Sequence, residues 1–154
     1  MKKKILFGIM CVLTLLLTTG CALSKDSLTG EEFTKISDEK GMITADVKEQ
    51  FAGYDYVLEA NVAVSQEGWQ IEHYVLETKE DAKTMYSKNK SDFEKFSDSK
   101  NVSSVVEVGN YTKYTLETGE YYMVLSRVDN TLLYVKVPVN NKDSAVKLID
   151  ALGY

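Results

Sequence analysis

The feature that most constrains the fold is a series of four short stretches, rich in valine, tyrosine and leucine, in the C-terminal half of the chain. They are separated by glycine, asparagine and aspartate residues, which tolerate the positive φ angles of tight turns. We therefore predict four consecutive strands, over Val102–Val108, Tyr111–Thr118, Tyr121–Val128 and Leu132–Val137. Because hairpins pair neighbouring strands antiparallel, these stretches predict an antiparallel sheet.

Two further strands precede this series. The segment from Tyr54 to Val64 places Tyr54, Tyr56, Leu58 and the following alternate residues on one face, a pattern typical of a half-buried strand. After a turn at Gly68, the apolar residues from Trp69 onward again alternate. The two segments therefore predict a second hairpin.

Capping signals and apolar periodicity predict three helices. Thr29 and Glu32 match a capping box, and residues 78–96 carry an apolar stripe at helical spacing. Asn141 is placed to cap a last helix that ends before Gly153. The full order is α-β-β-α-β-β-β-β-α, which predicts an α+β domain with an antiparallel sheet of about six strands and the helices on one face.

The first 21 residues differ in character from the rest. Three lysines at positions 2–4 precede an uncharged, mostly apolar run over residues 5–19. A helix of that length spans about 22 Å, less than the roughly 30 Å of a bilayer core, so the run suits a signal peptide better than a permanent span. It ends in Thr18-Thr19-Gly20-Cys21. This tetrapeptide resembles the lipobox of bacterial lipoproteins, with Thr18 where that family usually has leucine.

The resemblance implies that the chain is cleaved after Gly20 and that the thiol of Cys21 carries a diacylglyceryl group. It divides the chain into a signal peptide (1–20), a lipidated cysteine with a short tether (21–28) and a single extracytoplasmic α+β domain (29–154). The acyl chains on Cys21 then hold the domain at the outer face of the cell membrane. The alternatives are an ordinary signal peptide with a chance cysteine, or an uncleaved anchor.

Cleavage after Gly20 changes both the charge and the cysteine count. Of the 18 basic residues, 15 then face 23 acidic residues, which gives a net charge of −8. Nucleic-acid binding needs clustered basic side chains, so we expect no nucleic-acid partner. Cys11 leaves with the leader and Cys21 is acylated, so the domain has no disulfide, no thiol nucleophile and no cysteine metal site.

The single histidine, His73, is the one candidate for acid–base or metal chemistry. It either acts beside Glu59, Glu72 or Glu77, or is a half-buried strand residue with one ring nitrogen bonded to a neighbour. Zinc sites rarely rely on carboxylates alone, and the sequence contains no phosphate loop, calcium loop or nucleophile elbow. We therefore predict no catalytic residue, no metal and no cofactor.

Tyrosines are abundant, at ten in 154 residues. Four of them in the C-terminal strands, with the only arginine, form a candidate binding surface made of Tyr111, Tyr121, Tyr122, Tyr134 and Arg127. The adjacent Tyr121 and Tyr122 must point to opposite faces of one strand, so we expect at least one on an open face, ready to stack on a sugar or contact a protein. Alternatively, the tyrosines only cover a half-solvated sheet. Arg127 either clamps a carboxylate or phosphate or pairs with a local acid.

Together these features predict a monomeric, membrane-anchored extracytoplasmic lipoprotein whose domain binds an envelope protein or a small ligand without doing chemistry. In class it resembles the small lipoproteins of Gram-positive bacteria. One alternative is a small envelope hydrolase that uses carboxylates and His73. Another is a structural or assembly accessory of a membrane complex.

Overall fold

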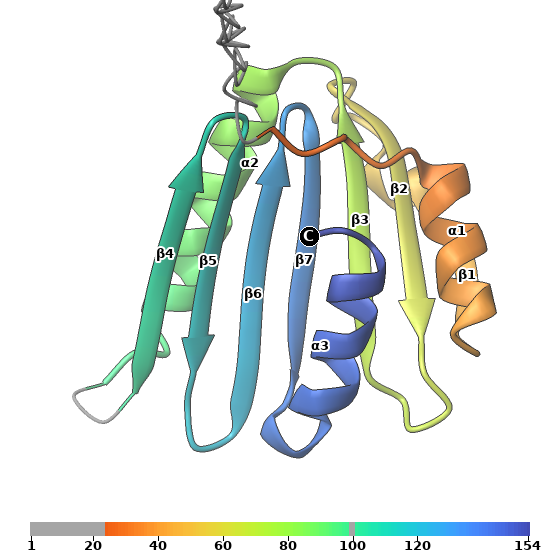
Figure 1. Cartoon of the computed structure of the whole chain (residues 1–154). Coiled ribbons are helices and arrows are strands. Elements are labelled where there is room, and N and C mark those ends of the chain that lie inside the picture. The colour runs from red at the N-terminus through yellow and green to blue at the C-terminus, as the bar shows by residue number, and fades with distance from the viewer. Residues whose placement is uncertain (1–23, 99–100) are drawn as a thin grey trace, which may run out of the picture.

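A computed structural model describes residues 24–98 and 101–154. Its centre is one seven-stranded antiparallel sheet with the order β1-β2-β3-β7-β6-β5-β4 (Figure 1). The strands are β1 (Ile43–Asp46), β2 (Val57–Val64), β3 (Gln70–Leu76), β4 (Val102–Val108), β5 (Tyr111–Glu117), β6 (Tyr121–Val128) and β7 (Thr131–Pro138). The predicted α+β class and the antiparallel sheet are confirmed.

The hairpins of the C-terminal half form as the turn residues predict. Val108 pairs with Tyr111 across a two-residue turn in which Gly109 has φ 60°. Val128 pairs with Thr131 across the next such turn, where Asp129 has φ 50°. Both values lie in the left-handed region, which glycine, aspartate and asparagine tolerate best. Local turn chemistry therefore sets the register of β4 to β7.

Three α-helices accompany the sheet: α1 (Gly30–Glu39), α2 (Lys79–Glu94) and α3 (Lys142–Ala151). The predicted capping box closes α1 at Thr29 and Glu32, and the structure adds a second one that closes α2 at Thr78 and Asp81. The prediction for α3 is wrong in detail, because Asn141 stands at its N-cap without a side-chain capping bond. Among the described residues, no helix is long and apolar enough to cross a bilayer.

The helices cover both faces of the sheet, so the prediction of helices on one face is wrong. α1 and α3 lie on one face and α2 lies on the other (Figure 1). The central strands bury side chains in both directions: on β6, Val124 joins the core under α1 and α3, whereas Met123 and Leu125 join the core under α2. A sheet that is apolar on both faces needs a covering layer on each.

The seventh strand, β1, corrects the predicted count of about six. Its four residues pair with β2 from Ile43↔Val64 to Asp46↔Asn61 and lead into the 3-10 helix η1 (Lys48–Phe51). A four-residue edge strand has too short an alternation to be read from sequence. Between β7 and α3, a second 3-10 helix, η2 (Val139–Asn141), completes the fold.

The start of β2 also differs from the prediction. Tyr54 and Tyr56 lie in a turn before the strand, where Gly53 has φ 92°. An irregularity in the pairing between Val57 and Glu59 then shifts the alternation by one residue. Leu58 is consequently exposed, because a bulge moves every side chain before it to the other face.

Candidate functional site

A groove of about 620 Å³ lies on the α1 and α3 face, at the end of the sheet where β2 turns into β3. Its apolar floor is Met42, Trp69 and Leu148, all largely buried. Polar and charged side chains surround the floor: Lys40, Ser65, Gln66, Glu67, Ser144, Lys147 and Asp150. An apolar floor with a few convergent polar groups, in this size range, is typical of ligand-binding sites.

The end of α1 builds one wall of the groove. Gly41 adopts φ 78° and its N–H donates to the Asp38 carbonyl at 2.9 Å. The next N–H, of Met42, donates to the Ser37 carbonyl at 3.1 Å. This left-handed glycine ends the helix and turns the chain back toward the sheet, which places Met42 in the floor and Lys40 on the rim.

The tight turn between β2 and β3 builds a second wall. Gly68 has φ 83°, and the N–H of Ser65 donates to the Trp69 carbonyl at 2.8 Å. The Trp69 N–H in turn donates to the Ser65 hydroxyl at 3.2 Å. Glu67, within this turn, accepts a hydrogen bond from the Asn141 side chain just before α3. The turn is thereby joined to the third wall, α3.

The rim carries two ammonium groups, of Lys40 and Lys147, and two carboxylates, of Glu67 and Asp150. Neither Lys40 nor Lys147 forms an ion pair within residues 24–98 and 101–154. Of the two rim carboxylates, Glu67 is engaged with Asn141. The groove can therefore offer two ammonium donors that are outside any ion pair among the described residues, and the hydroxyls of its serines, to a bound molecule above an apolar floor.

The sequence-predicted tyrosines do not form one surface. Tyr111 and Tyr122 are buried in the core under α1 and α3. Tyr121 and Tyr134 are half-buried on the opposite face, where Tyr134 packs against Phe93 with 5.0 Å between ring centroids. Burial raises the pKa of Tyr111, Tyr122 and Tyr134 above the ordinary value. Their main contribution is packing, because helices occupy both faces.

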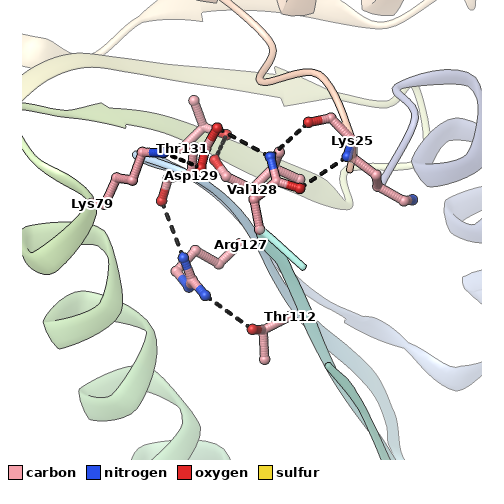
Figure 2. A network of polar contacts seen from close by, with 8 residues as sticks. Lys25, Lys79, Thr112, Arg127, Val128, Asp129 and Thr131 are labelled. Carbon is pink, nitrogen blue, oxygen red and sulfur yellow. Dashed lines mark hydrogen bonds and ion pairs between the residues drawn. The ribbon is translucent and has the colours of Figure 1, made fainter. Parts of the chain in front are cut away.

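Arg127 forms its hydrogen bonds within the fold, to the turn after its own strand and to the neighbouring strand. Its guanidinium donates to the Asp129 carbonyl oxygen at 3.3 Å and to the Thr112 hydroxyl at 3.1 Å (Figure 2). The carboxylate of Asp129 is instead paired with the Lys79 ammonium at 2.7 Å. The Lys79 and Asn110 hydrogen bonds, in that order, lower the pKa of Asp129. Arg127 thus holds neighbouring strands together and does not point into the groove.

His73 is completely buried, which corrects the expectation of a half-buried ring. It stacks on Phe33 of α1 at 5.1 Å and 13°, with Tyr154 at its edge. Burial lowers its pKa from 6.5 to about 4, offset in part by the backbone of Leu28. Neither ring nitrogen has a hydrogen-bond partner of good geometry among the described residues. The imidazole is a neutral core side chain that no substrate reaches.

Gly20 and Cys21 lie outside the described residues. Within them, no group of three or more histidine, cysteine, aspartate or glutamate side chains is placed to hold a metal ion. Comparison with known proteins adds no assignment: no family model, no curated protein and no solved structure matches the chain.

Sequence reasoning missed the groove because its walls come from three distant segments. The one usable signal was Trp69, the only tryptophan, which directly follows a glycine turn. Lys40 and Lys147 carry no local signal, since each looks like an ordinary exposed helix residue until the fold brings α1 and α3 together.

Proposed function

We propose that the chain is a membrane-anchored extracytoplasmic lipoprotein whose domain binds an anionic, partly apolar envelope fragment in the groove between α1 and α3. The ligand chemistry that fits is a carboxylate-bearing sugar or peptide, as in the fragments of a bacterial cell wall. The single observation that carries the proposal is the pairing of an apolar floor with two ammonium groups, Lys40 and Lys147, that form no ion pair among the described residues. Lysine supplies a point charge with three donors, which suits carboxylate capture.

The site supports binding without chemistry. A general base or nucleophile must reach the reacting atom in a cleft, and the only histidine is sealed in the core beneath α1. No histidine lines the groove, and the rim carboxylate of Glu67 accepts a hydrogen bond from the Asn141 side chain.

The lone tryptophan gives a direct test. The emission of Trp69 in the purified lipoprotein is recorded while soluble disaccharide-peptides from peptidoglycan are added. We expect a saturable spectral shift, because a ligand that covers the floor changes the solvation of the indole. Lys40→Ala and Lys147→Ala should each weaken binding about tenfold, the effect of losing one charge-assisted hydrogen bond of about 1.5 kcal/mol.

Lys35→Ala is the matched control, because Lys35 is an exposed lysine of the same helix that does not line the groove. It should bind as the wild type does. If the fragments leave the emission unchanged, or if Lys35→Ala weakens binding as much as Lys40→Ala, the groove is not their binding site.

Strand β4 favours a second candidate, an accessory role in a membrane complex. All seven of its residues are exposed, and four of them are valines. It is an edge strand without the lysine, proline or bulge by which proteins usually protect such edges. A partner's extended segment could add to it as a further strand. Chemical crosslinking from position 105 in native membranes, followed by mass spectrometry, tests whether a partner lies there.

A further inference from the structure

The first residues that the structure describes are fixed to the body of the domain. The backbone N–H of Lys25 donates to the Asn110 side-chain oxygen at 2.9 Å, and the Asn110 amide donates back to the Lys25 carbonyl at 2.8 Å. The Lys25 ammonium donates to the Gly153 carbonyl at 2.8 Å and lies 4.1 Å from the centre of the Tyr111 ring. The Asn110 side chain thus accepts one hydrogen bond from the Lys25 backbone and donates one to it, as the backbone of a paired strand would.

The asparagine is itself held in place. The Asn110 amide also donates to the Asp129 carboxylate at 3.0 Å, and that carboxylate pairs with Lys79 at the start of α2 (Figure 2). Two hairpin turns and a helix terminus are thus connected to Lys25. The leading segment cannot leave without breaking its own contacts to Asn110, Gly153 and Tyr111.

This clamp lies at one defined end of the sheet. The hairpins at Val108↔Tyr111 and Val128↔Thr131 close at that end, and the pair Val57↔Leu76 lies there as the open end of β2 and β3. The loop that precedes Val57 lies there too, with Tyr54 at 51% and Tyr56 at 38% of full exposure, and Leu58, at the start of β2, is 51% exposed beside it. We call the loop residues Tyr54 and Tyr56, together with Leu58 at the start of β2, the tyrosine loop.

The groove lies at the other end. β2 runs from Val57, beside the tyrosine loop, to Val64, which leads into the groove turn. Seven steps of about 3.3 Å separate the two ends of this strand by about 23 Å. The tyrosine loop and the groove therefore face opposite directions along the strands.

We propose that the clamped end of the domain faces the bilayer, with the tyrosine loop in contact with the lipid headgroups and the groove directed away from the membrane. This rests on the acylation of Cys21 in the proposed function. Three residues separate Cys21 from Lys25, so at most about 14 Å of extended chain lies between anchor and clamp. Tyrosine suits a bilayer interface, since its ring is apolar and its hydroxyl is polar.

The tether favours the lipid surface, and not a second copy of the chain or a protein partner, as the surface that contacts the tyrosine loop. The short tether keeps the clamped end of the domain, and with it the tyrosine loop, close to the headgroups of its own membrane. The effective concentration of lipid at the loop is therefore higher than that of any soluble partner. The net charge of −8 repels an anionic surface, so the domain does not lie flat on the membrane. Only the clamped end touches the lipid, through the aromatic side chains of the tyrosine loop. Added anionic lipid should weaken this contact.

Two tryptophan positions test the orientation. The acylated protein is placed in phosphatidylcholine vesicles that carry headgroup nitroxides, and quenching is compared between the wild type, which reports Trp69, and Tyr54→Trp combined with Trp69→Phe. We expect at least twofold stronger quenching at position 54. If the double variant does not fold, Tyr56→Trp with Trp69 retained gives the same comparison by difference.

Each outcome is decisive. An intact mass without acyl chains overturns the anchor and this orientation together. Acylated protein with equal quenching at both positions, or with stronger quenching of Trp69, overturns the orientation alone. Emission at position 54 that changes with protein concentration and not with lipid identifies a second copy on the loop and also overturns it.

The clamp has its own control. Asn110→Ala removes the paired hydrogen bonds to Lys25 and should reduce the difference in quenching between positions 54 and 69. Asn101→Ala, which removes a side-chain bond to the Phe96 carbonyl at the opposite end of the sheet, should leave that difference unchanged. Equal effects of the two variants contradict the role of the clamp.

Discussion

His73 makes the stability of the domain depend on pH in a way that its structure quantifies. The buried ring has a pKa of about 4, against 6.5 for an exposed histidine. Between pH 6.5 and pH 4, therefore, His73 is protonated in the unfolded chain and neutral in the folded one. The stabilisation is fully present above pH 6.5 and is lost as the pH falls toward 4.

The size of the effect follows from the two pKa values. At pH 5 the linkage relation gives a loss of about 2 kcal/mol from this one group, and well below pH 4 the loss approaches about 3 kcal/mol. The variant His73→Phe keeps a ring against Phe33 and has nothing to titrate. It also removes two buried nitrogens that have no hydrogen-bond partner of good geometry among the described residues, so we expect it to be at least as stable as the wild type at pH 8.

Urea unfolding of both proteins at pH 8, 6.5, 5.5 and 5 measures the difference. Carboxylates that titrate in this range contribute equally to the two proteins, so the difference in unfolding free energy isolates the histidine. It should grow by about 2 kcal/mol in favour of His73→Phe between pH 8 and pH 5. A difference that stays constant within about 0.5 kcal/mol over that range would refute the argument that the ring is buried and neutral.

Three further outcomes are expected. Phe33→Ala should lower the unfolding free energy by about 3–5 kcal/mol in urea, because Phe33 is fully buried against His73; a loss below about 1 kcal/mol contradicts this packing. Cys21→Ala should release the protein from membranes or stall its maturation, as seen by detergent partitioning and size, and unchanged behaviour contradicts acylation. Val105→Lys should leave the melting temperature within about 2 °C of the wild type, since surface changes cost little, and should reduce aggregation measured by light scattering; increased aggregation would contradict the role of the β4 edge.

Features set by neighbouring residues could be predicted from the sequence. The capping box at Thr29 forms as expected, because a cap depends on side chains within one turn of the helix. The turns at Gly109 and Asp129 fix the register of the C-terminal strands for the same reason. The leader motif ending at Cys21 is also local, and it remains a prediction.

Features that depend on distant segments were decided only by the tertiary structure. β3 pairs with β7 across more than fifty residues of sequence. This pairing forms a sheet whose central strands are apolar on both faces, so a helix must cover each face. The same pairing brings the end of α1, the Trp69 turn and α3 around one groove, and it seals His73 beneath Phe33. No local pattern encodes these contacts, because their free energy comes from apolar surfaces that meet only once the chain has closed its sheet.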